Sequence, residues 1–219
     1  CICAIFSKRT LRPVKARLSR KDDILLTGKR HDFVAKYQVG YNDEGIIQGI
    51  EIDLAARCGY SLDLSKAIVS RALFHADNTY FIPNATFKGF LCKTNTASNT
   101  AFRGFGGPQG MLTIENIIEE IANNMGTDPL NIRKINYYQK GSNNVTPYDQ
   151  VIEDNIIEEI TNELIEDSNY LSRRKEVGLF NKKNQFLKKG LSFSPVKFGI
   201  SFTTQLLNQA GALVSIYKD

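Results

Sequence analysis

A β-hairpin near the start of the chain is the feature that most constrains its fold. Apolar and polar side chains alternate over residues 33–42 and again over residues 46–56, which is the period of a strand with one buried face. Between them stands Asn42-Asp43-Glu44-Gly45, a sequence typical of hairpin turns because Asn and Gly accept positive φ angles. We therefore expect these two stretches to form an antiparallel pair of strands.

Three stretches show the features of helices. Apolar residues recur at three- and four-residue steps over residues 61–77 and, more strongly, over residues 108–125. Pro108 suits the first position of the second helix, and Gly126 suits its end. Residues 155–175 are acidic early and basic late, the arrangement that a helix dipole favours.

The remaining stretches are expected to be short strands and loops. Strands are predicted over residues 12–18, 87–93 and 190–217, with polar loops over residues 94–107 and 139–150. The last of these loops is the best candidate for a linker. Because helices and strands occur in mixed runs without strict β-α-β alternation, we predict an α+β fold with mixed and antiparallel sheets and packed helices.

The composition is that of an ordinary globular protein. Of the 219 residues, 42% are hydrophobic and 23% are charged, and the net charge is +5. This excess of positive charge is mild and does not require a nucleic-acid partner. We interpret the densest basic run, residues 173–189, as the solvated face and tail of a helix.

The cysteines indicate neither a metal site nor a disulfide framework. One pair is spaced as Cys1-x-Cys3, Cys58 and Cys92 stand alone, and no CxxC occurs. We expect them to be reduced and mostly buried, and the protein to be cytoplasmic. No apolar run reaches the ~18 residues of a membrane span, so no membrane is expected. Both ends look cut, the first like the end of a helix and the last like an interrupted strand.

The glycine-rich stretch NTAFRGFGGPQG, residues 99–110, carries the clearest sign of chemistry. Its glycines let the backbone approach a ligand closely, and free N–H groups at the start of the next helix favour an anion or an oxo group. Arg103 adds positive charge, and Phe105 stands between glycines. Taken alone, this pattern also fits a tight turn with a packed phenylalanine.

Five further blocks accompany this stretch. They read TGKRH at residues 27–31, RALFHADN at 71–78, CKTN at 92–95, KFGISFT at 197–203 and LNQAGAL at 207–213. In this order and spacing, the chain resembles the molybdenum hydroxylases, the family of xanthine dehydrogenases and aldehyde oxidases, over essentially its whole length. Within the family, it is most similar to the xanthine dehydrogenases of the bacterial two-subunit type.

The resemblance implies parts of two molybdenum-cofactor-binding domains. The first would cover residues 1–144, with the substrate pocket and the glycine-rich loop, and the second would begin over residues 145–219. Phe102, Arg103 and Gly104 match cofactor-binding positions. The backbone of Arg103 is expected next to the molybdenum.

The resemblance also implies three residues that bind the substrate. Arg71 matches an arginine that contacts a purine carbonyl, where a guanidinium would stabilise the negative charge that builds during oxidation. Phe105 and Phe202 match two phenylalanines that hold the flat ring, one stacked and one edge-on.

Three more residues match positions around the substrate. Thr203 matches a threonine that hydrogen-bonds the substrate. Leu64 and Leu207 match apolar residues that line the entry, although an ordinary role in the core remains open for both.

The implied reaction is hydroxylation of purines, from hypoxanthine to xanthine to urate, at a molybdenum–molybdopterin centre. Electrons would pass through 2Fe-2S clusters and FAD to NAD, on a partner subunit, so a hetero-oligomer is expected. The family's catalytic glutamate belongs to a downstream segment. Glu115, Glu119 and Glu120 do not replace it, since they lie on a helix that begins after the cofactor loop. We therefore expect no catalytic residue here and no activity from this stretch alone.

Two alternatives remain. An aldehyde oxidase-like enzyme would share the FRGFG loop, but such enzymes usually carry an apolar residue at the position of Arg71. The KFGISFT block also favours the xanthine dehydrogenases. A non-catalytic basic binding module, from a different class, is supported only by residues 173–189.

Overall fold

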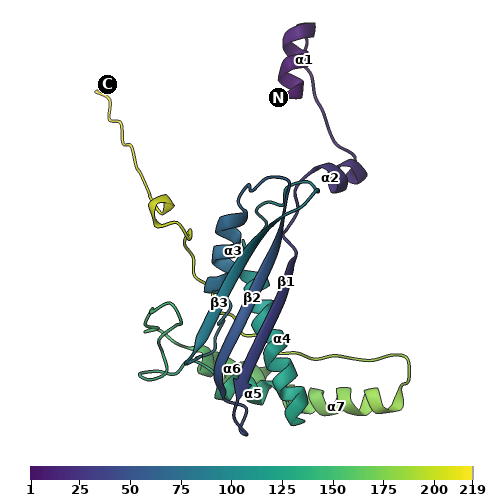
Figure 1. The fold of residues 1–219 in the computed structure, drawn as a ribbon, viewed down its shortest axis with the longest axis vertical. Helices are drawn as coiled ribbons and strands as arrows, with labels where there is room; N and C mark the ends of the chain where they lie inside the picture. The colour runs from purple at the N-terminus through teal and green to yellow at the C-terminus, as the bar shows by residue number, and fades with distance from the viewer. Residues whose placement is uncertain (219) are drawn as a thin grey trace.

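The computed structural model describes residues 1–218 (Figure 1). Three strands form its sheet: β1 (Phe33–Tyr41), β2 (Ile47–Gly59) and β3 (Ala85–Lys93). Seven α-helices and one 3₁₀ helix accompany them: α1 (Ile2–Thr10), α2 (Arg20–Leu26), α3 (Ser65–Phe74), α4 (Gly107–Met125), α5 (Pro129–Ile135), α6 (Ile157–Asp167), α7 (Tyr170–Lys183) and η1 (Gln205–Leu207).

The sheet has the strand order β1-β2-β3 and is mixed. Strands β1 and β2 form the predicted antiparallel hairpin, with Phe33 opposite Ala56. Asn42 closes its turn, because its Oδ1 accepts hydrogen bonds from the N–H groups of Glu44 and Ile46 at 3.1 and 2.9 Å. Strand β3 pairs parallel with β2, since α3 lies in the connection between them. The mixed sheet and its packed helices confirm the predicted α+β class.

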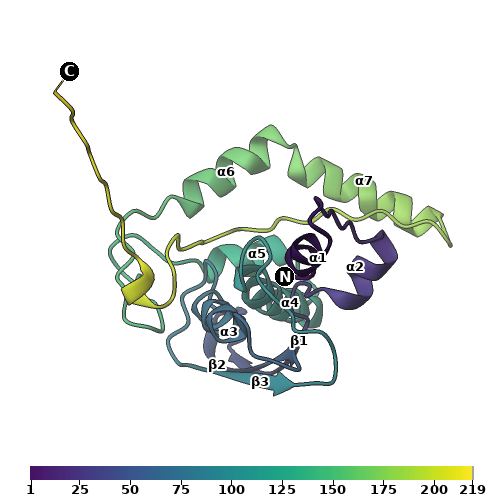
Figure 2. The ribbon, with the colours of Figure 1, turned by 90° about the horizontal axis from the view of Figure 1, so that it is seen from above.

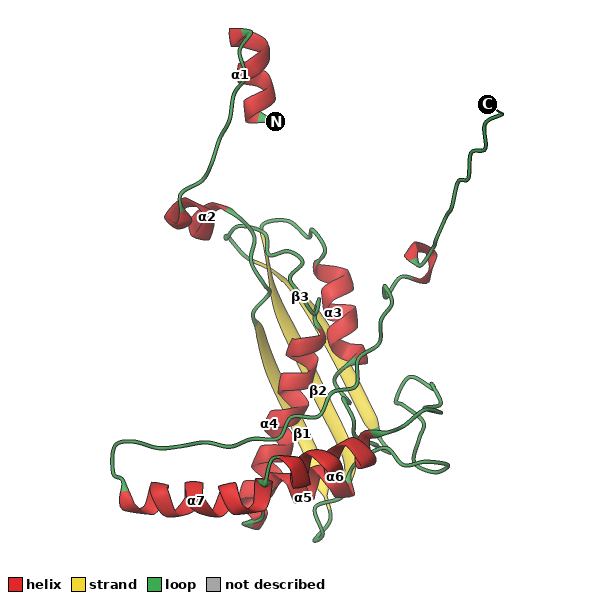
Figure 3. Cartoon of the chain, turned by 180° about the vertical axis from the view of Figure 1, so that it is seen from behind, coloured by secondary structure: helices red, strands yellow, loops and turns green. Residues whose placement is uncertain are grey.

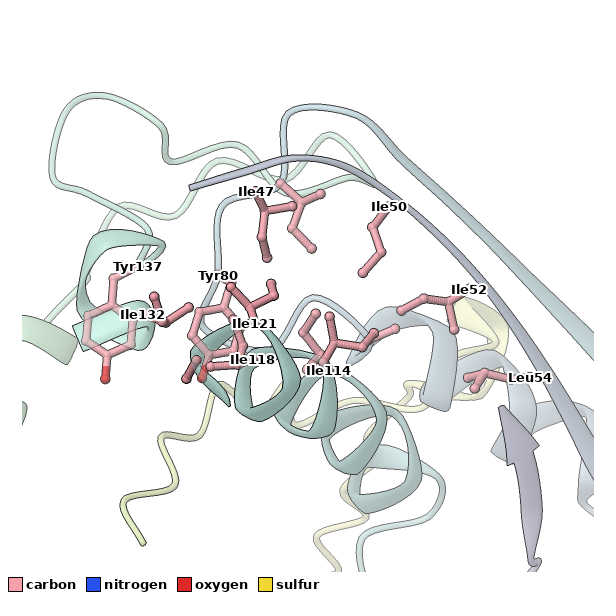
Figure 4. Close-up of a cluster of buried hydrophobic side chains, with 14 of the residues drawn as sticks. Ile47, Ile50, Ile52, Leu54, Tyr80, Ile114, Ile118, Ile121, Ile132 and Tyr137 are labelled. Atoms are coloured by element: carbon pink, nitrogen blue, oxygen red, sulfur yellow. The ribbon is translucent and has the colours of Figure 1, made fainter. Parts of the chain in front are cut away.

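Helices α3 and α4 cover one face of the sheet (Figures 2 and 3). Pro108 stands at the start of α4, and Gly126 ends it in the left-handed conformation, both as predicted. The apolar stripe of α4 points toward β2 (Figure 4). Its buried members are Ile114, Ile117, Ile118 and Ile121.

A buried ion-pair network joins α4 to α5. Arg133 is 2% exposed and contacts Glu115 at 2.9 Å and Glu119 at 2.7 Å. Tyr80 and Asn78 also donate to Glu115, at 2.6 and 2.9 Å. Because a buried charge is tolerated only when it is paired and hydrogen-bonded, these two glutamates have a structural role.

The single helix predicted over residues 155–175 is two helices, α6 and α7. The break falls at Ser168 and Asn169, where Asn169 has a φ of 50° and turns the chain. Arg174 ties α7 back to the start of α5, because its Nε donates to Asp128 Oδ2 at 2.8 Å. The basic run over residues 173–189 contains no buried residue, as predicted for a solvated helix face and tail.

Two of the predicted strands are wrong. Residues 12–18 contain no strand, and neither do residues 190–217. A strand needs a neighbour for its N–H and C=O groups, whereas alternation reports only a pattern of side chains. Pro13 lacks an N–H group, and Leu213 and Ile216 are exposed rather than packed on a sheet face. The strand predicted over residues 87–93 is confirmed as β3.

All four cysteines are free, as predicted, but only Cys58 is buried. The expectation that most are buried is wrong for a local reason. Cys92 lies on β3 at the edge of the three-stranded sheet, and Cys1 and Cys3 belong to α1 and its start, where no helical residue is buried. Among the helices of residues 1–218, none has both the length and the apolar character to cross a membrane.

Replacing Ile118 by Ala should lower the free energy of unfolding of the complete protein that contains this chain. Ile118 lies on α4 and is fully buried in the core that this helix shares with the sheet. The change therefore removes apolar contacts and leaves a cavity, at a cost of about 2–5 kcal/mol. Leu112→Ala on the same helix is the matched control, since Leu112 is 64% exposed. Equal losses in denaturant unfolding would contradict this assignment of the core.

Candidate active site

Residues 195–203, which contain the KFGISFT block, lie along helix α3 and run in the opposite direction. Just beyond the end of α3, Asn78 donates to Pro195 O and accepts from the N–H of Lys197, both at 2.9 Å. The other contacts follow in reverse order: Gly199 N–H to His75 Nε2 at 3.2 Å, Arg71 to the carbonyls of Gly199 and Ser201, and Thr203 Oγ1 to Ala67 O at 3.5 Å. The segment therefore packs on the helix that carries Arg71.

Arg71 lies between this segment and the glycine-rich loop. Its Nη1 donates to Gly199 O at 2.9 Å, and its Nη2 donates to Ser201 O. Its guanidinium carbon lies 5.3 Å from the ring centre of Phe198 and 5.8 Å from that of Phe105. A guanidinium has five N–H donors, so donors remain for a ligand.

The charge of Arg71 has no acidic partner. The residue is 7% exposed, yet within residues 1–218 no carboxylate pairs with it, and its buried Nε has no hydrogen-bond partner. Two other cations with little exposure, Arg133 and Lys197, each pair with a carboxylate. Half-buried Arg30, at the glycine-rich loop, resembles Arg71 in donating to a carbonyl oxygen, that of Arg103. A buried cation compensated only by carbonyl dipoles favours an anionic or electron-rich ligand.

Phe105 and Phe202 face each other beside this guanidinium. Their ring centres are 5.6 Å apart and their planes are tilted by 47°. Phe105 comes from the glycine-rich loop and Phe202 from the 195–203 segment, with Thr203 next to it. The structure thus brings together Arg71, Phe105, Phe202 and Thr203, which were predicted to bind the substrate.

The glycines of the loop are required by its contact with α3. Gly104, Phe105 and Gly106 all have positive φ, at 90°, 50° and 98°. A Cβ atom at Gly106 would stand 2.0 Å from the carbonyl oxygen of Ile68 in α3. Only glycine permits this approach, and the approach sets Phe105 against Arg71.

The corner of the loop fits the cofactor that the sequence predicts. The backbone N–H groups of Arg103 and Gly104 donate to no acceptor within residues 1–218, and Arg103 is exposed. Adjacent free N–H groups form a concavity suited to an anion or an oxo group. Arg30 fixes this corner, because its Nη2 donates to Arg103 O at 2.6 Å and its guanidinium lies 4.3 Å from the centre of the Phe102 ring.

A cavity of about 640 Å³ opens at Arg71. Its lining includes Arg71, Phe74, His75, Tyr148, Lys197, Phe202 and Thr203. A larger cavity, of about 1020 Å³ at one end of the sheet, contains none of the predicted site residues. Phe105, Leu64 and Leu207 do not line the smaller cavity. Phe105 reaches it through its contact with Phe202, whereas Leu64 and Leu207 are 40% and 61% exposed, so their place at the entry stays a prediction.

His75 bridges α3 and the 195–203 segment as a neutral ring. Its Nε2 accepts the N–H of Gly199, and its Nδ1 lies 2.8 Å from Arg71 O. Because Nε2 accepts, the proton belongs on Nδ1, which donates to the carbonyl. Burial lowers the pKa of His75 below 6.5, and the nearby charges of Arg71 and Lys197 act in the same direction.

Sequence reasoning gave no role to His75, Asp77 or Lys197, although all three stand in the matched blocks. One signal was available. Arg71 and His75 are four residues apart on a helix and therefore share one face, so a ligand-binding Arg71 implied a neighbouring His75. Lys197, the partner of Asp77, is distant from it in sequence, so no local pattern predicts the pair.

Comparison with known proteins decides the family. A family model described as a molybdopterin cofactor-binding domain matches residues 1–137. The chain belongs to this family. The predicted resemblance to the molybdenum hydroxylases is therefore confirmed, and the molybdenum–pterin group is its implied cofactor.

Two relatives of this molybdopterin cofactor-binding chain align with it over its full length. Xanthine dehydrogenase of Dictyostelium discoideum is 46% identical over 219 residues, 100% of this chain and 16% of that protein. Xanthine dehydrogenase/oxidase of Gallus gallus is 44% identical over 218 residues, with the same coverage. The aldehyde oxidoreductase of Desulfovibrio gigas superposes with a TM-score of 0.72 at 26% identity, covering 84% of this chain and 20% of its own. The chain thus spans about a sixth of the curated relatives' length.

Replacing Gly106 by Ala should destabilise the loop of this molybdopterin cofactor-binding chain. The added Cβ meets the carbonyl of Ile68 at 2.0 Å, and a φ of 98° is strained for alanine, so we expect a loss of about 1–3 kcal/mol in the free energy of unfolding of the complete protein. Gly178→Ala in α7 is the control, because a Cβ there meets nothing within 4 Å. The assignment fails if both variants unfold alike.

The pKa of His75 predicts acid sensitivity. Its folded pKa is below the ordinary value of 6.5, so below that pH the unfolded chain binds a proton that the folded chain resists. The free energy of unfolding should therefore be highest above about pH 6.5 and fall as the pH drops below it. In thermal unfolding of the complete protein from pH 7 to 5, His75→Gln should show a shallower decline than the unsubstituted protein. An unchanged slope would contradict the neutral bridge.

Proposed function

We propose that this chain supplies the substrate pocket of a purine hydroxylase, which takes hypoxanthine to xanthine and xanthine to urate. The observation that carries the proposal is a buried arginine without an acidic partner, Arg71, beside the facing rings of Phe105 and Phe202. The xanthine dehydrogenases among its relatives, at 44–46% identity, support it.

The pocket chemistry matches a flat, electron-poor ring with carbonyl groups. Aromatic faces and edges orient a planar heterocycle, at roughly 0.5–1.5 kcal/mol for each pair beyond burial. A guanidinium donates two parallel hydrogen bonds to oxygen and stays charged at every physiological pH. Arg71 would thus bind a purine carbonyl and stabilise the negative charge that develops on the ring. The hydroxyl of Thr203 would add a further hydrogen bond.

The cofactor would lie at the corner of the glycine-rich loop. The N–H groups of Arg103 and Gly104 and the ring of Phe102 are the groups of this chain that would hold it. When bound, a molybdenum–pterin group supplies the oxidising chemistry, while the protein supplies position and electrostatics. The resemblance to the family implies that the base is a glutamate outside this chain, and Glu115 and Glu119 are held by Arg133.

The proposal extends to the rest of the enzyme. Electrons would leave through 2Fe-2S clusters and FAD to NAD, held by other parts of the protein or by a partner subunit of a hetero-oligomer. A division of this chain into domains at residues 144 and 145, and assignment to the two-subunit type, belong to the same proposal. Four free cysteines support a cytoplasmic location.

An aldehyde oxidoreductase is the second candidate. The likeness to the Desulfovibrio gigas enzyme favours it. Against it stands Arg71, since an aldehyde offers no second carbonyl for a guanidinium to hold, and a buried cation without a ligand is costly.

Replacing Arg71 by Met in the complete enzyme distinguishes the two. Loss of one charge-assisted contact to the transition state should lower kcat/KM for xanthine by about a hundred- to a thousandfold, as with oxyanion-hole deletions. The kcat/KM for an aldehyde should fall far less. The measurement is urate formation and aldehyde oxidation with the same preparation.

Arg173→Met is the matched control, because Arg173 lies exposed on α7 away from the cavity. It should leave both rates unchanged. An equal loss on xanthine and on the aldehyde in the Arg71 variant would refute the role assigned to the guanidinium.

A further inference from the structure

Asp77 and Lys197 form an ion pair where residues 195–203 begin to follow α3. The Asp77 side chain is fully buried, and that of Lys197 is 23% exposed. Lys197 Nζ contacts Asp77 Oδ2 and lies 3.1 Å from the hydroxyl of Tyr148. The hydroxyl of Tyr138 donates to the same Oδ2 at 2.5 Å.

Three distant parts of the chain meet at this pair. The turn after α3 supplies Asp77, the connection after α5 supplies Tyr138 and Tyr148, and the segment with the KFGISFT block supplies Lys197. The Lys197 ammonium also lies 5.1 and 5.2 Å from the ring centres of the two tyrosines, within the range of a cation–π interaction.

The buried negative charge of Asp77 is compensated by Lys197. Within residues 1–218, Lys197 is the cation that pairs with Asp77, and Asp77 Oδ1 is buried with no hydrogen-bond partner. Burial raises the pKa of Asp77 and lowers the pKa of Lys197, and the attraction between the two charges opposes both shifts. Removing either charge alone therefore leaves the other buried and uncompensated.

The pair also fixes a register. Lys197 and Phe202 lie on one segment, which contacts α3 and the residues just after it in reverse order. A slip of one residue along α3 would move Phe202 away from Phe105, whose ring centre lies 5.6 Å from its own.

We propose that Asp77 and Lys197 are a positioning pair that sets the register of residues 195–203 on α3 and so holds Phe202 opposite Phe105. The inference rests on the proposed function for its effect on purine binding. Lys197 lines the same cavity as Arg71, but its charge is committed to Asp77. It therefore acts through geometry, whereas Arg71 meets the ligand.

The test uses the complete enzyme with Lys197→Met and Lys197→Arg, and measures hydrogen–deuterium exchange of the peptide over residues 195–203 together with kinetics on xanthine. In Lys197→Met, exchange should be faster and KM should rise roughly tenfold or more, with a smaller change in kcat and unchanged molybdenum content. Arginine keeps the positive charge, so Lys197→Arg should return the exchange rate and the KM most of the way to those of the unsubstituted enzyme. Lys140→Met is the matched control, because it breaks an exposed ion pair with Glu159. It should change neither the exchange of residues 195–203 nor the KM for xanthine.

Should Lys197→Met fail to fold, Asp77→Asn combined with Lys197→Met removes both charges and avoids an uncompensated one. That double variant should fold and still show the faster exchange and the raised KM. Unchanged exchange and KM in the variants that fold would overturn the inference, as would no recovery with arginine. If the unsubstituted enzyme forms no urate, the proposed function fails, while the exchange data still decide whether the pair holds the segment.

Discussion

The packing around helix α3 is the constraint on which the site depends. The sheet covers one side of the helix, the glycine-rich loop approaches its backbone, and residues 195–203 follow it in the opposite direction. Each of the last two contacts depends on one residue. Gly106 permits the approach of the loop to Ile68, and His75 accepts a hydrogen bond from the N–H of Gly199. Arg71 comes from α3 itself, and it meets Phe105 and Phe202 because the two segments that carry them are held on this helix.

Buried charge is used in two different ways around this helix. Arg133 and Lys197 are satisfied by carboxylates, so they join elements without attracting a ligand. Arg71 donates only to carbonyl oxygens. Breaking a buried pair is costly because it leaves one charge uncompensated, and a charge buried without a partner costs stability and is found where binding requires it. This contrast separates the structural ion pairs from Arg71, the residue that we propose binds the substrate.

Much of the local structure could be predicted from the sequence. The hairpin around Asn42 and helix α4, with Pro108 and Gly126 at its ends, follow from local rules of turns and caps, and both are confirmed. The false strand over residues 190–217 shows the limit of such rules. That stretch alternates, but in part of it the partner is a helix, and alternation cannot tell a helix surface from a sheet edge.

The site was predictable to a smaller degree and for a different reason. Family blocks selected Arg71, Phe105 and Phe202, and the structure places them together. The Asp77–Lys197 pair lay outside this reasoning, because its two members are far apart in sequence and each resembles a surface residue by itself. Asp77 and Lys197 stand in recognisable motifs as Arg71 does, but their pairing becomes visible only when the chain is folded.

The most direct measurement is urate formation from xanthine by the complete enzyme, with an aldehyde as the parallel substrate. A pocket built on an unpaired Arg71 and two facing phenylalanines predicts urate formation with little aldehyde oxidation. Aldehyde oxidation without urate would contradict the account. It would mean that the family and cofactor are correct but that Arg71 does not bind the substrate.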